Sequence, residues 1–236
     1  MDIAALIAQM NGNPRPALIY VSQDERLELS YHVMANWMSK IANLVTLDCG
    51  AEVGQKIVID LPVHWRAIAW TGGAWTSGLT CASSIFTAEG EVADDVIGWV
   101  SNDAHKAEDI VDSGFSGDMW LQALPSLALA WPGELPAGVE DATQSIMSCA
   151  DALIEPADKS GVPSPSEIIS KAHEQIVTNR KGSPITVTHG SVSDVTQLVL
   201  LAWQANQCVV VGDDSYAHLH ENNDGLVIDL AAIKAR

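Results

Sequence analysis

The chain has 236 residues, of which 47% are hydrophobic and 18% charged, and this composition excludes an intrinsically disordered protein. Its 30 acidic residues against 12 basic ones give a formal net charge of −18. A surface of this charge repels phosphate backbones and anionic lipid, so we expect neither nucleic acid nor a membrane as a partner. The length fits one large domain or two small ones.

The first half of the chain predicts a helix, a hairpin and then alternating helices and strands. The expected helices lie at residues 2–11, 30–49, 65–77 and 104–112, and the expected strands at 17–21, 27–29, 56–61, 79–83, 96–101 and 119–124. Ser30 can cap the second helix and Gly50 can end it. Helix–strand–helix–strand order predicts a right-handed crossover between parallel strands.

The helix that starts after Ser30 carries an apolar stripe. Its members follow one another at three- and four-residue spacings, which place them on one helical face. They are Val33, Trp37, Ile41 and Leu44. We therefore expect Trp37 to be buried in the core.

The second half is less regular. Residues 127–131 predict a strand or an extended segment, and residues 140–149 a helix or a loop. Ser164, Pro165 and Glu167 predict a capped helix start, with Ser164 as the cap. The helix should run to about residue 179. Strands at 184–188, 208–211 and 226–230 and a helix capped by Ser191 or Ser193 complete the expected elements.

A short repeated motif, here called the echo, relates two parts of the chain. Ala74-Trp75-Thr76-Ser77-Gly78 and Ala202-Trp203-Gln204-Ala205-Asn206 both precede a predicted strand, and both end in a residue that tolerates the left-handed conformation. The echo predicts that Gly78 and Asn206 occupy equivalent helix ends in two related units. Coincidence in a five-residue match is the alternative.

These segments carry a family resemblance. The residues concerned are Pro16-Ala17-Leu18-Ile19-Tyr20, Leu29-Ser30-Tyr31, Ile41-Ala42-Asn43-Leu44, Val53-Gly54-Gln55-Lys56-Ile57, Leu61-Pro62 and the Ala74–Gly78 motif. They resemble the N-terminal part of AMP-forming acyl-CoA synthetases, members of the adenylate-forming superfamily, and in particular a short actinobacterial family that keeps only this front portion. The resemblance implies an α/β fold with mixed, largely parallel sheets and flanking helices. It also implies one truncated domain, residues 1–236, with possible subdomains 1–150 and 151–236.

Adenylate-forming enzymes bind the phosphates of ATP with a loop rich in Ser, Thr and Gly that ends near a lysine. By position, the equivalent segment here is residues 155–167, and it offers Lys159, Ser160 and Gly161 as weak nucleotide-binding candidates. Glycines are otherwise lost from this segment, and it gains three prolines, which lack the N–H groups that cradle phosphate. Glu155 and Asp158 add negative charge at the same place. We expect no working phosphate cradle.

The later motifs of the superfamily, including its lid lysine, do not occur in the sequence. We therefore expect no catalytic residue, no cofactor and no metal. The predicted function is a non-catalytic binding or interaction module that binds an unknown protein partner or a second copy of itself. The alternative is an acyl- or nucleotide-binding protein that completes an adenylating site with another chain.

Other candidate sites are weaker. His218 and His220, in a polar acidic stretch, could hold a metal but lack a fixed third ligand. Another pattern, His64-Trp65-Arg66, follows a strand end, where α/β sheets place ligands, although helix-start packing is the simpler interpretation. A hydrolase that uses His189 or His105 is the third class considered, and Ser191 lacks the flanking glycines of a nucleophile elbow.

The chain has four widely spaced cysteines, and none lies in a Cys-x-x-Cys pair. They are Cys49, Cys81, Cys149 and Cys208. We expect them to be reduced, buried thiols rather than zinc ligands. The sequence shows neither a secretory signal nor a membrane-spanning run of apolar residues, so we expect a cytoplasmic location.

Overall fold

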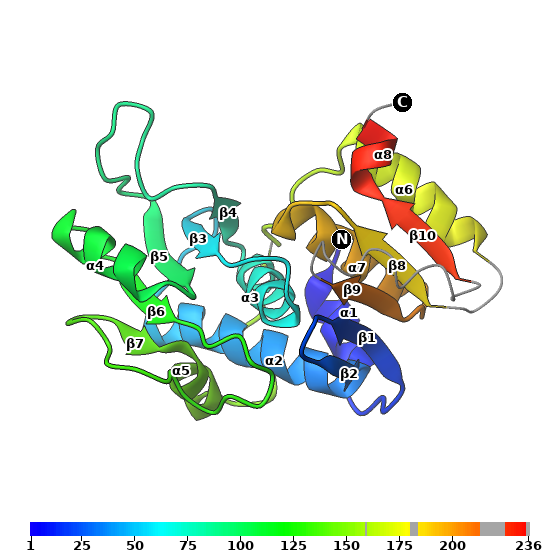
Figure 1. The fold of residues 1–236 in the computed structure, drawn as a ribbon, viewed down its shortest axis with the longest axis horizontal. Coiled ribbons are helices and arrows are strands. Elements are labelled where there is room, and N and C mark those ends of the chain that lie inside the picture. Colours follow the sequence, from blue (N-terminus) through cyan, green and yellow to red (C-terminus); the bar gives the residue numbers. More distant parts are fainter. Residues whose placement is uncertain (159, 180–183, 213–224, 235–236) are drawn as a thin grey trace. The chain divides into compact units, whose positions relative to one another are not determined.

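The computed structural model describes residues 1–158, 160–179, 184–212 and 225–234 (Figure 1). The chain forms two compact units whose segments alternate along the sequence. The first unit comprises Met1, Trp37–Leu61 and Gly73–Val162, and the second comprises Asp2–Asn36, Pro62–Gly72 and Pro163–Arg236. This division describes packing. The sequence-based subdomain boundary between residues 150 and 151 stays a prediction.

The first unit contains a five-stranded sheet in the order β4-β3-β5-β6-β7, and all four of its strand pairings are parallel. Its strands are β3 (Lys56–Asp60), β4 (Thr80–Ala82), β5 (Val96–Ser101), β6 (Asp118–Leu121) and β7 (Glu140–Asp141). Helix α3 (Trp65–Thr76) connects β3 to β4, so the parallel pairing predicted for this crossover is confirmed. The unit also contains α4 (Ala104–Asp112) and α5 (Ala142–Ser148).

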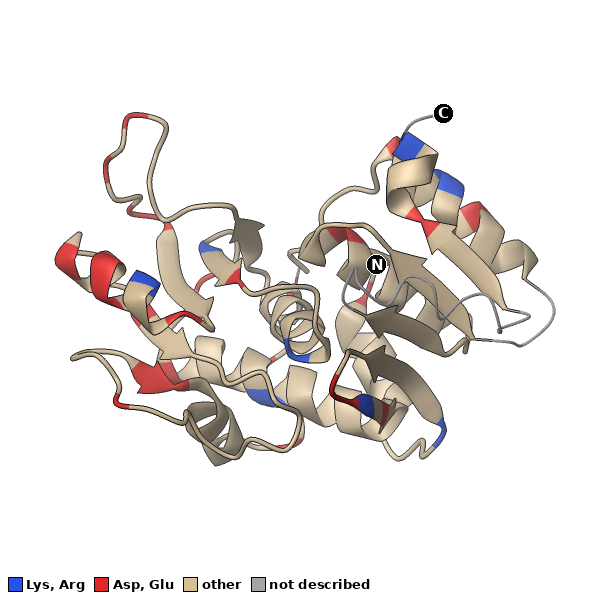
Figure 2. Cartoon of the chain, viewed as in Figure 1, with Lys and Arg blue, Asp and Glu red and all other residues tan. Residues whose placement is uncertain are grey.

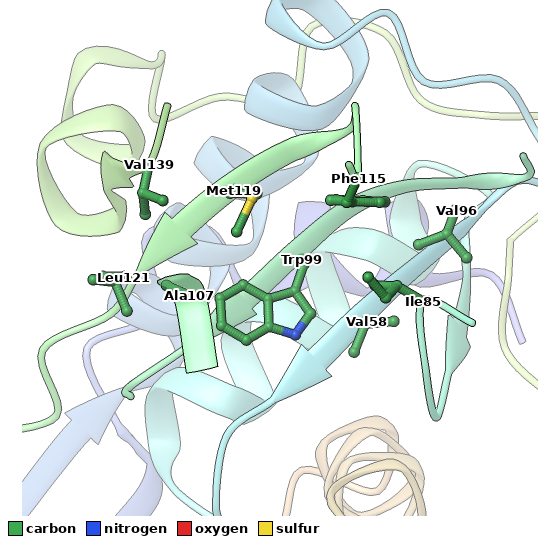
Figure 3. Packing of buried hydrophobic residues seen from close by; sticks show 9 residues of the cluster. All are labelled: Val58, Ile85, Val96, Trp99, Ala107, Phe115, Met119, Leu121 and Val139. Atoms are coloured by element: carbon green, nitrogen blue, oxygen red, sulfur yellow. The ribbon is translucent and has the colours of Figure 1, made fainter. Parts of the chain in front are cut away.

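A tryptophan lies at the centre of the apolar cluster of this unit. Trp99, from β5, is 3% exposed and packs among side chains from β3, α4 and β6 (Figure 3). The buried members of the cluster are Val58, Ile85, Val96, Trp99, Ala107, Phe115, Met119, Leu121 and Val139. Strands of a parallel sheet are covered on both faces, which is why β5 reads as a nearly continuous apolar run.

The second unit contains a five-stranded sheet in the order β10-β8-β9-β1-β2. The hairpin β1 (Pro16–Val21) and β2 (Arg26–Ser30) is antiparallel, as expected, and the other pairings are parallel. The remaining strands are β8 (Ile185–Thr188), β9 (Val209–Gly212) and β10 (Leu226–Asp229). The helices are α1 (Ile3–Met10), α6 (Glu167–Thr178), α7 (Val192–Gln204) and α8 (Leu230–Lys234). Mixed, largely parallel sheets with flanking helices are therefore confirmed.

Two local predictions need correction, and one that was left open is decided. Helix α6 is capped by Ser166 and not by Ser164, because the Ser166 hydroxyl accepts the Ile169 N–H at 3.2 Å. Residues 127–131 form no strand, and their backbone is irregular. The segment left open at 140–149 contains both the short strand β7 and helix α5.

The apolar stripe of α2 (Tyr31–Asn43) is displaced from its predicted position. Val33 and Trp37 are only half-buried, whereas Met34 and Met38 are fully buried together with Ile41. The buried face is thus turned by about one residue from the predicted one. In the first unit, a Cβ atom on Gly73 of α3 would lie 2.6 Å from Ile41 Cγ2, so α3 packs tightly against this face.

We therefore expect Met38→Ala to cost about 2–5 kcal/mol of unfolding free energy, because it empties a fully buried site. Trp37→Ala should cost less than Met38→Ala, since water already reaches part of the ring. Urea unfolding monitored by circular dichroism measures both. A larger loss for Trp37→Ala would restore the stripe inferred from the sequence.

The echo between Gly78 and Asn206 is confirmed in backbone detail. Both residues are left-handed, with φ of 82° at Gly78 and 55° at Asn206, and each follows a helix end by two residues. Leu79 N–H donates to Ala74 C=O at 3.0 Å, and Gln207 N–H donates to Ala202 C=O at 2.9 Å. Each helix thus ends in a Schellman motif at the same place relative to its Ala-Trp pair.

Gly78→Ala should cost about 1–2 kcal/mol, because a Cβ atom is strained in the left-handed region. Asn206→Gly should stay within about 0.5 kcal/mol of wild type, since glycine fits this position without strain. Equilibrium unfolding in urea compares the two variants. If Gly78→Ala unfolds at the wild-type urea concentration, the left-handed turn does not form in solution.

Candidate functional site

The segment that corresponds by position to the phosphate loop lies in the irregular connection between α5 and α6. Gly161 N–H donates to the Trp75 carbonyl at 2.8 Å, at the C-terminal end of α3. A Cβ atom at Gly161 would lie 1.6 Å from the Leu79 carbonyl oxygen. The glycine is therefore required for close backbone packing, and its N–H group is already used.

The other two candidates of this segment are Ser160 and Lys159. The Ser160 hydroxyl donates to the Met1 carbonyl at 3.1 Å, so this group also bonds to the protein. Lys159 lies outside the described residues. Next to them, the Pro163 carbonyl accepts from the Gln197 amide at 2.7 Å. The described part of the segment is thus tied to its surroundings by its own polar groups.

A cavity of about 340 Å³ lies at the carboxyl end of the sheet in the first unit. Open α/β sheets bind ligands in this position, beyond the carboxyl ends of parallel strands. The wall combines strand residues, the connection after β4 and one face of α4. Its principal lining residues are Val58, Ile85, Phe86, Trp99, Lys106 and Asp109.

A charged network borders the cavity. Lys106 Nζ lies 3.1 and 2.9 Å from the two carboxylate oxygens of Asp60, and the Ser101 hydroxyl donates to the second oxygen at 3.1 Å. The hydrogen bonds that Lys106 donates to the Asp60 carboxylate raise the pKa of Lys106. Asp103 caps α4 by accepting the N–H groups of His105 and Lys106. The Asp60–Lys106 pair is partly exposed, so its contribution to stability is small, but it cancels both charges locally.

Sequence reasoning missed this network. Asp60 and Lys106 are 46 residues apart, and only the parallel pairing of β3 and β5 brings their neighbourhoods together. The available signal was positional, because Asp60 and Ser101 are the last residues of adjacent parallel strands.

The His64-Trp65-Arg66 segment at the start of α3 packs in the protein interior. The His64 side chain is 2% exposed and lies edge-on to the Tyr20 ring, with the ring centroids 4.3 Å apart. Burial, and then the nearby Arg66 charge, lower the pKa of His64 to about 3. His64 Nδ1 accepts the Arg66 N–H at 3.1 Å, and the Arg66 guanidinium stacks 4.6 Å from the Trp65 ring centroid. The buried histidine is therefore neutral, which agrees with helix-start packing.

A histidine–aspartate pair lies at the carboxyl edge of the second sheet. His189 Nδ1 is 3.3 Å from Asp229 Oδ1, and His189 has an unusual left-handed φ of 54°. Asp229 Oδ1 also accepts the Ala232 N–H at the start of α8. The Ser191 hydroxyl is bonded to Asp194 and caps α7, so it is not presented to His189 as a nucleophile.

Among the described residues, the remaining candidates do not come together with other catalytic or metal-binding side chains. His105 is exposed beside Glu108, and His218 and His220 lie outside the described residues. Within the part of the chain that the structure describes, no group of three His, Cys, Asp or Glu residues could hold a metal, and no helix is long and apolar enough to cross a bilayer.

All four cysteines are free but half-buried, rather than buried as the sequence suggested. Burial raises the pKa of Cys208 to about 11 and that of Cys81 to about 12. At neutral pH these two are thiols rather than thiolates, so they are unreactive.

Comparison with known proteins tests the family resemblance. No model of a protein family matches the chain. A TIGR03089 family protein of Mycobacterium tuberculosis is 28% identical over 131 residues, which are 55% of this chain and 51% of that protein. A crystal structure of a Brucella canis acyl-CoA synthetase superposes with a TM-score of 0.69 at 14% identity, covering 97% of this chain and 47% of the synthetase. The fold is that of the N-terminal domain of adenylate-forming enzymes.

Two further structures of the same class are similar. Coronafacic acid ligase from Pectobacterium brasiliense gives a TM-score of 0.62 at 11% identity over 94% of this chain and 47% of the ligase. The anthranilate CoA ligase AuaEII, in complex with anthranoyl-AMP, gives 0.64 at 10% identity over 89% of this chain and 44% of that protein. The chain thus has the adenylate-forming fold and spans about half the length of the relatives it matches.

The neutral His64 within this fold predicts a pH dependence. Between about pH 6.5 and 3 the unfolded chain binds a proton at this residue and the folded chain does not. The free energy of unfolding should therefore fall with falling pH, with a contribution from His64 that approaches about 1.4 kcal/mol per pH unit.

His64→Gln should make this slope shallower by that amount, whereas His105→Gln, at an exposed histidine, should leave it unchanged. Urea unfolding at pH 7, 6 and 5 measures the slopes. Identical slopes for wild type and His64→Gln would mean that His64 titrates normally in the folded protein.

Proposed function

We propose that this chain is a non-catalytic binding module built on the adenylate-forming fold. The observation that carries the proposal is the state of Gly161, the residue that a phosphate-gripping loop would most need. Its N–H group is bonded to Trp75, and its Cα atom is pressed against the Leu79 carbonyl. A backbone held in this way cannot turn its donor toward a phosphate without giving up a helix-end contact.

The charge of the segment supports the same proposal. Glu155 and Asp158 lie beside the position that phosphate would take, and the chain carries a net charge of −18. Both features oppose a triply or quadruply charged nucleotide. Pro156, Pro163 and Pro165 offer no N–H donors in the same segment.

An interaction role has an apolar surface available to it. Leu127 and Leu129, in the irregular segment after β6, are 87% and 84% exposed. Their side chains are available for contact with a partner. They also suit the second candidate function, in which the chain contributes acyl or nucleotide binding to a site completed by another chain. The free cysteines are consistent with a cytoplasmic setting, which is part of the proposal.

The test is binding and turnover with Mg·ATP. A ligand at a hundred times its dissociation constant stabilises a fold by about 2.7 kcal/mol, which a thermal melt resolves. We expect millimolar Mg·ATP to give no shift beyond that of inert salt at equal ionic strength. We also expect no ATP–pyrophosphate exchange with anthranilate or short carboxylic acids.

A shift specific to nucleotide would support the second candidate, provided that Lys159→Ala abolishes it and Lys171→Ala does not. Lys171 is the matched control because it lies on α6 and pairs with Glu167 on the same helix. Pyrophosphate exchange by the chain alone would overturn the non-catalytic proposal.

A further inference from the structure

The cavity at the carboxyl end of the first sheet is backed by apolar side chains of the core. Val58, Ile85 and Trp99 line it and are also members of the buried cluster, where the Trp99 indole lies beside the other two (Figure 3). Side chains held in a core cannot withdraw to let the cavity close. Phe86 adds a ring that is 40% exposed at the start of the following loop. These aromatic and aliphatic surfaces suit a ligand with an apolar body.

Three charged side chains line the same cavity, and their charges do not sum to zero. They are Asp60, Lys106 and Asp109. Lys106 is bonded to both carboxylate oxygens of Asp60, so these two charges cancel. Among the described residues, no donor or cation contacts the carboxylate of Asp109. The lining therefore carries one uncompensated negative charge.

The surroundings of the cavity increase this negative potential. Helix α4 carries Glu108, Asp109 and Asp112 against a single lysine, and Figure 2 shows this helix as mainly acidic. Since the chain as a whole has a net charge of −18, short- and long-range fields have the same sign.

We propose that this cavity binds a small organic cation, an amine with an apolar or aromatic body. The ammonium group meets the Asp109 carboxylate, and the body lies against Phe86, whose partly exposed ring face also attracts a cation. This proposal rests on the binding role proposed above and names its ligand class. A ligand that carries several phosphates would instead bring like charge to Asp109 and to the acidic face of α4.

The cavity volume agrees with a ligand of modest size. At about 340 Å³ it lies near the lower end of the range for small-molecule sites, roughly 300–1,000 Å³. An arylalkylamine such as tryptamine is a suitable probe, because it combines a ring, a short linker and an ammonium group. Indole-3-propionate is its matched control, with a carboxylate in place of the ammonium.

The experiment is isothermal titration calorimetry of the full chain with these two probes, and with coenzyme A and Mg·ATP at equal ionic strength. We expect tryptamine to bind at least tenfold more tightly than indole-3-propionate. Asp109→Asn should weaken tryptamine binding about tenfold and remove most of this preference. Asp112→Asn, at an exposed acid of the same helix that does not line the cavity, should leave the affinity unchanged.

Thermal melts of each variant show whether it folds, and Phe86→Ala provides a second route, with weaker binding of both probes expected from loss of the ring. Equal affinities for amine and acid, absence of tryptamine binding, or equal effects of Asp109→Asn and Asp112→Asn would each overturn the cation site. Binding of coenzyme A alone would overturn the ligand class and leave the non-catalytic role standing. Pyrophosphate exchange would overturn that role whatever the amine does.

Discussion

Close backbone packing at the C-terminal end of α3 is the constraint on which the first unit depends. The Trp75 carbonyl accepts two N–H groups there, from Gly78 at 3.2 Å and from Gly161 at 2.8 Å. Gly161 lies against the Leu79 carbonyl, and Gly73 lies against Ile41 of α2. A side chain at Gly73 or Gly161 would force these backbones apart. The same helix end leads directly into β4, so it also fixes that edge of the sheet.

This packing bears on the segment that corresponds by position to the phosphate loop of the adenylate-forming fold. A loop that cradles phosphate must leave several N–H groups unpaired and pointing at one place. Here the described groups of residues 160–163 bond instead to the N-terminus, the end of α3 and the side chain of Gln197. The described part of the segment therefore forms a structural connection. A polar network lies at the other end of the strands, beside a cavity.

The carboxyl ends of the parallel strands carry paired polar side chains in both units. Asp60 with Lys106 lies at this edge in the first sheet, and His189 with Asp229 lies there in the second. Side chains at this edge point away from the strand ladder and are reached from several loops, which is why α/β proteins use it for ligands. In the first unit the edge also borders a cavity lined in part by apolar side chains, and this combination is why we propose a binding site there and not in the second unit.

Local patterns in the sequence determined most of the elements, because caps, glycines and apolar spacing act within a few residues. Such signals predict the parallel crossover from β3 to β4 and the matching ends at Gly78 and Asn206. They also predict a helix cap at Ser191 or Ser193, of which the structure selects Ser191. Tertiary structure alone decided which side of α2 faces inward, because neighbouring apolar stripes through Trp37 and Met38 are equally regular in sequence. It also decided the roles of Gly161 and Asp109, since a hydrogen bond to a distant carbonyl, or the lack of a counter-charge, depends on contacts that no local spacing encodes.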